Sequence, residues 1–260
     1  MPEILVSHDG PIARVGISYP ERRNALTYDM MLALPRVLET LGSDPDTRVI
    51  VLSGATPEAF AAGGDISEFK ILRNSREDED RYISATNRAL LAPATCAKPV
   101  IASIRGYCMG GGLQLAVACD LRIVADDAVF RMPAARLGVG YPAAGIERFI
   151  AVIGASNTTD LFISARQFGA AEALRMGFAN RVVAAADLDR EVDAYCAAVA
   201  DNAPLTIAAA RATVREAIAD PARRDAADLK RSIDACWGSH DYNEGRQAFL
   251  EKRKPRFLGR

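Results

Sequence analysis

The sequence predicts an α/β fold in which a largely parallel sheet is covered by helices, followed by a mainly helical C-terminal part. In the first part, short β-branched runs alternate with helical patterns, which favours parallel strands joined by helical crossovers. From about Gly145 onward, alanine-rich helical stretches dominate. The chain has 260 residues and is 50% hydrophobic. This suffices for one sizeable core, or for a core with a small appendage.

Six runs have the composition of β-strands, and the last of them is the weakest. They are Ile4–Ser7, Ala13–Tyr19, Val49–Ser53, Val100–Ile104, Leu121–Val124 and Arg181–Val183. Between the second and third runs, one helical face is formed by Met30, Leu34, Val37, Leu38 and Leu41. Thr27 is the expected N-cap of this helix, and Pro35 lies inside the same face, where it disfavours an unbroken helix.

The second half of the sequence contains four helical stretches. They are Gly145–Ser164, Asp187–Asp201, Pro204–Ala219 and Ala222–Trp237. In the last of them, one face carries Leu229, Ile233, Cys236 and Trp237. One strongly charged stretch, Asn74–Arg81, is expected to be a solvated loop or the start of a helix.

The charge and cysteine content exclude several classes of protein. Lys and Arg number 32 against 33 Asp and Glu, so no charge excess favours nucleic acid or an acidic membrane surface. The first residues show no signal-peptide pattern, and no apolar run approaches the roughly 18 residues of a membrane span. The 5 cysteines are odd in number and form no CxxC pair, so neither a disulfide framework nor a metal site is expected. We therefore expect a cytoplasmic protein.

Two glycine-dense turns, Ala61–Ile66 and Gly106–Gln114, carry the main chemical signal. Each follows a β-type run and opens a helical one. Backbone N–H groups at a helix start have no intrahelical partner, and glycine allows a ligand to approach closely. Two such donors that converge on one oxygen stabilise an oxyanion or an enolate. The alternatives are ordinary turns or a phosphate cradle, although neither turn matches GxGxxG or GxxxxGK[ST].

The order of several segments resembles the enoyl-CoA hydratase/isomerase (crotonase) superfamily over nearly the whole chain. These segments are Arg23–Leu26, Phe60–Ile66, Lys98–Ala102, Gly106–Gly112, Ala118–Arg122, Asp241–Gly245 and Ala248–Phe257. The resemblance implies a crotonase-like spiral of ββα units with a helical C-terminal trimerisation region. The spiral core with the acyl-CoA site would span residues 1–200, and the oligomerisation region residues 201–260. It further implies an acyl-CoA ligand and a homotrimer or a dimer of trimers.

The resemblance also implies roles for individual residues. The oxyanion donors would be the amides of Gly64 and Gly111. The adenine and pantetheine path would be lined by Ala62, Asp65 and Ile66. The nucleotide of coenzyme A would be contacted by Lys254 and Phe257, often from a neighbouring subunit, and its phosphates by Arg23. Lys254 has a second interpretation as a solvated tail charge, and Asp65 as the cap of its helix.

Two positions depart from the pattern of a hydratase of this family, which uses two glutamates to activate water. Gln114 occupies the first position, and Ala134, after Pro133, occupies the second. A glutamine orients water but is not a base, and alanine offers no polar group. Because one positioned acid–base group contributes about 10²–10⁴-fold, little hydratase activity is expected. The substrate pocket is expected to include Met132, Ala134 and Arg136.

The segment Leu137–Tyr141 resembles the methylmalonyl-CoA decarboxylase branch of this superfamily, in which a tyrosine lies beside the thioester. Decarboxylation suits a site without carboxylates, because the substrate's own carboxylate leaves as carbon dioxide. Tyr141 or water would then protonate the enolate, and Gln114 and Arg136 would not repel the substrate. That branch often has a histidine where this chain has Gly64. The alternative for Tyr141 is a half-buried tyrosine that only lines the pocket.

The sequence therefore predicts an acyl-CoA enzyme of fatty acid metabolism that stabilises a thioester enolate and acts as a decarboxylase-like lyase. No cofactor beyond coenzyme A itself, no nucleic acid and no membrane partner are expected. One alternative is a non-catalytic acyl-CoA binding protein. Another is a hydratase or isomerase that uses a carboxylate from elsewhere, such as Glu147.

Overall fold

A six-stranded sheet forms the framework of the first of two units into which the chain divides, Met1–Ala194 and Tyr195–Arg260. The computed structural model describes residues 1–72 and 74–260. The strand order is β1 (Glu3–Asp9), β2 (Ile12–Ser18), β3 (Val49–Gly54), β5 (Val100–Ile104), β7 (Leu121–Ala125) and β10 (Arg181–Val183). Strand β1 pairs antiparallel with β2, and the remaining neighbours are parallel. All six predicted strands are thus confirmed, and so is the largely parallel sheet.

A second sheet of four short strands was not predicted. It consists of β4 (Ala59–Ala61), β6 (Tyr107–Met109), β8 (Val129–Arg131) and β9 (Gln167–Gly169). Strands β3, β5 and β7 of the first sheet are each followed by a strand of the second sheet and then by a helix. This repetition is the predicted spiral of ββα units, and the crotonase-like fold is confirmed.

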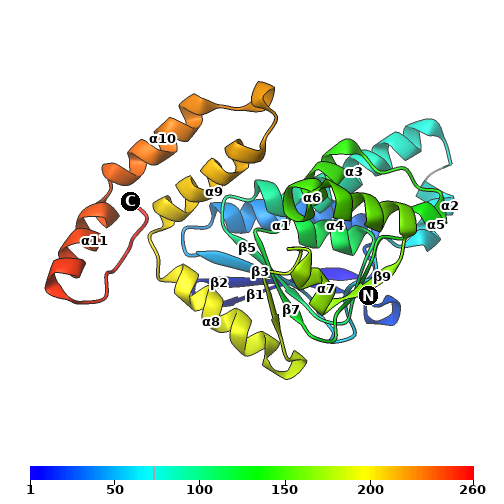
Figure 1. The fold of residues 1–260 in the computed structure, drawn as a ribbon, viewed down its shortest axis with the longest axis horizontal. Helices are drawn as coiled ribbons and strands as arrows, with labels where there is room; N and C mark the ends of the chain where they lie inside the picture. Colours follow the sequence, from blue (N-terminus) through cyan, green and yellow to red (C-terminus); the bar gives the residue numbers. More distant parts are fainter. Residues whose placement is uncertain (73) are drawn as a thin grey trace. The chain divides into compact units, whose positions relative to one another are not determined.

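Helices cover the sheets of the first unit (Figure 1). Four of them pack side by side in the order α1 (Tyr28–Ser43), α3 (Arg76–Thr95), α4 (Gly111–Ala118) and α6 (Ala143–Ser164). The shorter elements are η1 (Pro20–Arg22), η2 (Ile66–Glu68), α2 (Phe69–Leu72), α5 (Ala134–Leu137), α7 (Ala170–Arg175) and η3 (Ala185–Asp187). Helix α8 (Leu188–Ala200) spans the division between the units.

Helix α1 begins as predicted and includes the whole predicted apolar face. Thr27 Oγ1 accepts a hydrogen bond from the Met30 amide at 3.3 Å, so the N-cap is confirmed. Pro35, which disfavours an unbroken helix, does not interrupt it, and the helix runs through this residue to Ser43. The apolar face packs into the core through fully buried Leu34 and Leu38. This burial outweighs the lost backbone hydrogen bond.

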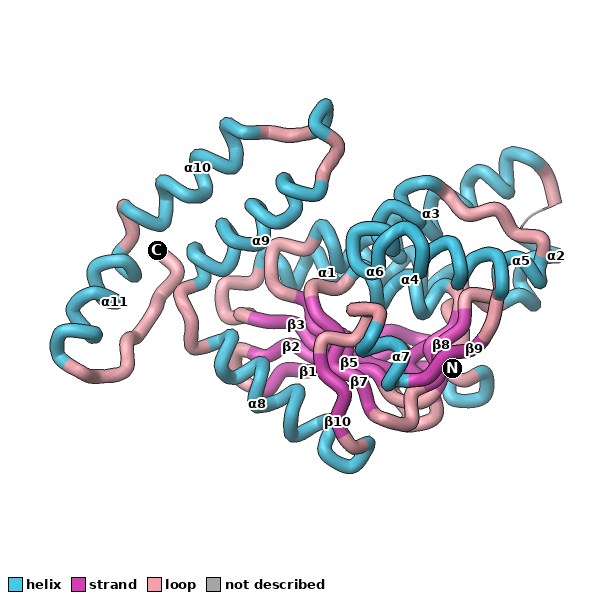
Figure 2. Tube along the Cα trace, in the orientation of Figure 1, coloured by secondary structure: helices cyan, strands magenta, loops and turns pink. Residues whose placement is uncertain are grey.

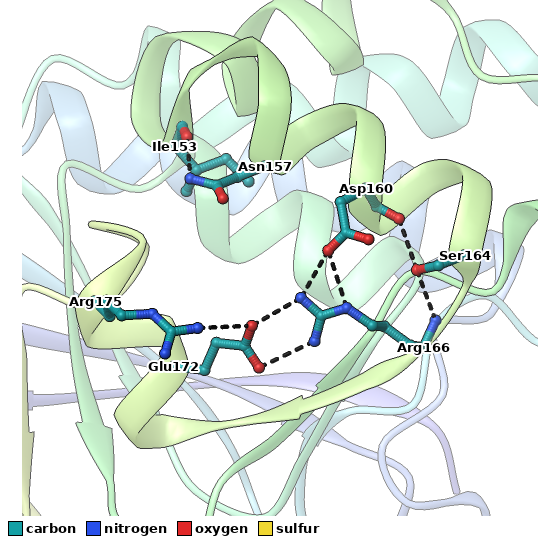
Figure 3. A network of polar contacts seen from close by, with 7 residues as sticks. All are labelled: Ile153, Asn157, Asp160, Ser164, Arg166, Glu172 and Arg175. Carbon is teal, nitrogen blue, oxygen red and sulfur yellow. Dashed lines mark hydrogen bonds and ion pairs between the residues drawn. The ribbon is translucent and has the colours of Figure 1, made fainter.

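A network of ion pairs fixes the connection between α6 and α7 (Figure 3). Arg166 follows the end of α6 and donates to Asp160 Oδ2 at 2.6 Å and to Glu172 Oε1 at 2.7 Å. Arg175 donates to the same Glu172 oxygen at 3.2 Å. Helix α6 also contains a kink at Gly154, whose φ of 77° favours glycine. The network therefore anchors the C-terminal part of α6 beyond this kink.

The described residues of the second unit form helices and loops (Figure 2). The helices are α9 (Pro204–Ile218), η4 (Pro221–Arg223), α10 (Ala226–Trp237) and α11 (His240–Glu251). Helix α10 begins four residues later than predicted, because Asp225 caps it by accepting from the Asp228 amide at 2.8 Å. Helix α11 was not predicted. Throughout the described chain, no helix is both long and apolar enough to cross a membrane.

Candidate active site

The amides of Gly64 and Gly111 lie next to each other in the first unit. An alanine Cβ at Gly111 would lie 3.5 Å from the backbone nitrogen of Gly64. Leu26 pairs with the residues on either side of Gly64, since its amide donates to the Gly63 carbonyl at 2.7 Å and its carbonyl accepts from Asp65 at 2.8 Å. This pairing leaves the Gly64 amide directed away from Leu26. Gly111 is the first residue of α4, where an amide has no intrahelical acceptor.

The glycine preceding each amide makes the turn possible. Gly63 has a φ of 103° and Gly110 a φ of 49°, values that L side chains rarely adopt. Neither the Gly64 amide nor the Gly111 amide donates to another group in the part of the chain that the structure describes. Two unpaired donors so close together can share one oxygen atom, as an oxyanion requires.

Both glycines line a cavity of about 590 Å³. Its walls are mainly apolar, with contributions from α2, α3, α4 and the segment between α5 and α6. The polar side chains in the lining are those of Glu79, Tyr82, Thr86, Asn87, Gln114 and Tyr141. A largely apolar cavity with a few polar groups is typical of a small-molecule site.

Helix α3 forms one wall of this cavity. Leu90 Cδ1 would lie 3.6 Å from a Cβ at Gly111, and Tyr82 Oη would lie 3.4 Å from a Cβ at Gly64. Glu79 is one helical turn before Tyr82 and also lines the cavity. The charged stretch Asn74–Arg81 is thus the start of a helix, capped by Ser75, and not only a solvated surface. Sequence reasoning missed Tyr82 and Glu79, although a spacing of three residues places them on one helix face.

Gln114 lies on α4, three residues after Gly111, and its side chain is only 2% exposed. Its Nε2 atom has no hydrogen-bond partner among the described residues. On its other side, an alanine Cβ at Gly145 would lie 2.6 Å from Nε2. Gln114 therefore occupies a tight space between the cavity and helix α6.

Tyr141 lines the cavity from the segment that precedes α6. Its ring packs edge-on against Phe162 with a centroid distance of 5.1 Å. Burial raises the pKa of the Tyr141 hydroxyl to about 12, and the nearby Tyr82 contributes to the shift. The hydroxyl is therefore protonated at neutral pH, where it can donate a hydrogen bond, and it is a weaker acid than an exposed tyrosine.

The other residues expected near the glycine turn differ in their surroundings. Ile66 lines the cavity. Asp65 is buried and accepts from the Ser67 amide at 3.0 Å, so its interpretation as a cap is confirmed. Ala62 donates to the Arg23 carbonyl at 3.0 Å. The Arg23 guanidinium lies 4.8 Å from the centre of the Tyr107 ring, on the surface.

Three residues expected in the substrate pocket are absent from the described lining of the cavity. Met132 and Ala134 are buried in the hydrophobic core. Arg136 is exposed on α5. Glu147 is exposed on α6 and is likewise not part of this described lining, whereas Glu79 is.

Lys254 and Phe257 belong to the second unit. Lys254 Nζ donates to Asp201 Oδ2 at 2.6 Å. A Cβ at Gly245 would lie 3.4 Å from Phe257 Cε1, so the ring packs against α11. Both side chains are thus engaged within this unit.

Cysteine and metal chemistry receive no support from the described residues. All 5 cysteines are free thiols. Burial raises the pKa of the Cys108 thiol in the second glycine turn, which disfavours a thiolate nucleophile. No group of three or more His, Cys, Asp or Glu residues in the described chain is arranged to hold a metal ion.

The fold and the site together define a ββα-spiral protein whose paired amides can polarise a carbonyl oxygen. Comparison with known proteins agrees with this class. The model of the enoyl-CoA hydratase/isomerase family matches residues 8–260. The chain belongs to this family.

Individual relatives have the names of hydratases and isomerases. A Mycobacterium leprae protein named "Probable enoyl-CoA hydratase" is 33% identical over 99% of this chain and 98% of its own length. A peroxisomal Delta(3,5)-Delta(2,4)-dienoyl-CoA isomerase of Arabidopsis thaliana is 30% identical over 96% of this chain and 93% of its own. The structure of an enoyl-CoA hydratase/carnithine racemase from Magnetospirillum magneticum superimposes with a TM-score of 0.94 at 34% identity, covering 100% and 97% of the two chains.

Proposed function

We propose that this protein binds an acyl-CoA and stabilises its thioester enolate at the amides of Gly64 and Gly111. The observation that carries the proposal is the closeness of these two unpaired donors, since a Cβ at Gly111 would lie 3.5 Å from Gly64 N. Donors aimed at a developing negative charge in a largely apolar cavity are effective because no solvent must reorganise. No cofactor beyond coenzyme A itself is required for this chemistry.

The reaction that these residues support best is a decarboxylase-like lyase step. The bond between the α-carbon and the substrate's carboxylate breaks, and carbon dioxide leaves. The electron pair moves into the thioester, whose oxygen accepts hydrogen bonds from the two amides. The Tyr141 hydroxyl or a water molecule then protonates the α-carbon, and the tyrosine regains its proton from solvent. Gln114, which stays neutral at every pH, supports this step because it does not repel an anionic substrate.

A second candidate is hydratase or isomerase chemistry, which Glu79 favours. Its carboxylate is half-buried in the lining of the same cavity. A carboxylate there can remove a proton from one carbon of an unsaturated acyl chain and return it to another. The substitution Glu79→Gln separates the two candidates. The variant should lose any isomerisation or hydration that depends on Glu79. Its rate of decarboxylation should stay within about threefold of the wild-type rate.

The second unit supports assembly into a homotrimer or a dimer of trimers. Its helices surround an apolar groove of about 860 Å³. Trp237 is 62% exposed and Phe249 84%, which is unusual for large hydrophobic side chains in a monomer. The 5 free thiols fit a reducing compartment, and we place the protein in the cytoplasm.

The direct test is to incubate the purified protein separately with methylmalonyl-CoA, malonyl-CoA and crotonyl-CoA. The proposal expects release of carbon dioxide from one of the first two and slow hydration of the third. Efficient hydration of crotonyl-CoA alone would overturn the lyase assignment. Tight binding of acyl-CoA without turnover would instead favour a non-catalytic acyl-CoA binding protein.

A further inference from the structure

Gln114 is a buried amide whose donor is unused. The side chain is 2% exposed, and Nε2 finds no acceptor among the described residues. Buried N–H groups without an acceptor are rare in native proteins, because their desolvation is not compensated. Since Gln114 also lines the cavity, a bound ligand is a source of the missing acceptor.

Gly145 makes the room for this amide. A Cβ there would lie 2.6 Å from Gln114 Nε2 and 3.2 Å from Cδ. Gly145 is in the first turn of α6, where alanine would favour the helix. Packing therefore explains the glycine at this position, because a side chain there would displace the Gln114 carboxamide.

The carboxamide has two orientations of the same shape, related by a half turn of its terminal torsion. In one, the NH₂ group faces Gly145, where no acceptor is available. In the other, the NH₂ group faces the cavity and the carbonyl oxygen faces Gly145. An under-satisfied buried carbonyl is tolerated better than an orphaned N–H group. A ligand with an acceptor in reach would thus fix the second orientation.

We propose that Gln114 is a specificity-determining hydrogen-bond donor that selects acyl groups with a carbonyl or carboxylate bonded to the α-carbon, and that Gly145 keeps it in place. Malonyl-type and 3-oxoacyl thioesters are the substrate class. This inference rests on the proposed function, in which the thioester oxygen lies at Gly111, three residues before Gln114 on the same helix face.

Glu79 lines the same cavity from α3, one helical turn before Tyr82. A neutral 3-oxoacyl group meets no charge repulsion from this carboxylate, whereas a malonyl-type carboxylate does.

The test compares two thioesters of nearly the same shape by calorimetric titration. Acetoacetyl-CoA has a carbonyl on the α-carbon, whereas isovaleryl-CoA has a branched alkyl group there, and neither can lose carbon dioxide. Wild-type protein should bind acetoacetyl-CoA about three- to tenfold more tightly, as a net neutral hydrogen bond provides. Gln114→Leu should abolish this preference, and Gln114→Glu should reverse it. Isovaleryl-CoA should bind all three proteins similarly.

A second variant tests the role of Gly145. Gly145→Ala should lower the preference for acetoacetyl-CoA without weakening isovaleryl-CoA. The matched control is Gly169→Ala, because a Cβ there meets nothing within 4 Å, and it should leave both affinities unchanged. Combining Gly145→Ala with the shorter amide of Gln114→Asn should restore part of the preference.

An unchanged preference in Gln114→Leu would overturn the inference, whatever Gly145→Ala does. If wild-type protein binds neither thioester, the proposed function itself fails. If it binds both equally, only the role of Gln114 fails.

Discussion

The hydroxyl of Tyr82 lies beside Gly64, since a Cβ at Gly64 would be 3.4 Å from Tyr82 Oη. The Tyr82 ring is held by stacking on Tyr28, at a centroid distance of 5.8 Å, and by an edge contact with Phe69 at 5.5 Å. The hydroxyl is therefore positioned at the amide that is expected to bind the thioester oxygen.

Tyr82→Phe should keep the fold and lower kcat/KM about three- to tenfold, which corresponds to the net value of one hydrogen bond. Steady-state kinetics and a thermal unfolding curve measure the two effects. Tyr82→Ala should also lower the stability, because both ring contacts are lost. A Phe variant with unaltered kcat/KM would exclude the hydroxyl from the reaction.

Gly111→Ala and Gly112→Ala form a matched pair, in which the first variant should lose activity and the second should lose stability. At Gly111, a Cβ meets Gly64 N at 3.5 Å and Leu90 Cδ1 at 3.6 Å, which is ordinary contact, but it occupies the expected position of the thioester oxygen. Activity should fall about 10²–10³-fold with stability retained. At Gly112, a Cβ would lie 2.4 Å from the Ala61 carbonyl oxygen, so unfolding should become easier by about 1–3 kcal/mol. Urea unfolding and turnover assays distinguish the two outcomes.

Tyr141 should make stability depend on pH in the alkaline range. Burial raises its pKa in the folded protein to about 12, above the ordinary value of 10. Between these values the unfolded chain has lost the proton and the folded chain retains it, so stability present below pH 10 is lost as the pH rises toward 12. In Tyr141→Phe, the unfolding free energy should depend less on pH over this range. An identical alkaline decline in the Phe variant would assign the effect to other groups.

The Arg166 network should contribute modestly to stability, more than an isolated surface pair. Hydrogen bonds from Arg166 hold the pKa of Glu172 below its ordinary value. This stabilisation is present above the ordinary pKa of the carboxyl and is lost as the pH falls through the folded value. Arg166→Ala should lower the unfolding free energy at pH 7 by about 1 kcal/mol. Arg175→Ala, whose side chain is mostly exposed, should change it by only about 0.3 kcal/mol; equal losses would contradict this ranking.

The six predicted strands were recognisable because each has a run of β-branched or aliphatic residues, and all six form one sheet. The strands of the other sheet have only three residues each, and Gln167–Gly169 even includes a glycine, so local composition gave no signal. Pairing with neighbouring strands, which only the tertiary fold provides, determines them.

The same difference applies to the site. The glycine turns were predictable because a backbone with positive φ and free amides favours glycine, and clustered glycines are visible in the sequence. The contribution of Tyr82 and Glu79 was not, because the face of α3 that meets the cavity is set by its packing between α1 and α4. Met132 and Ala134 were expected in the substrate pocket, yet both are buried in the hydrophobic core.

A crystal structure with bound isovaleryl-CoA tests the central claim most directly. We predict that the thioester oxygen lies within about 2.7–3.1 Å of the backbone nitrogens of both Gly64 and Gly111. A thioester bound in this cavity with its oxygen directed away from both amides would contradict the proposed mechanism.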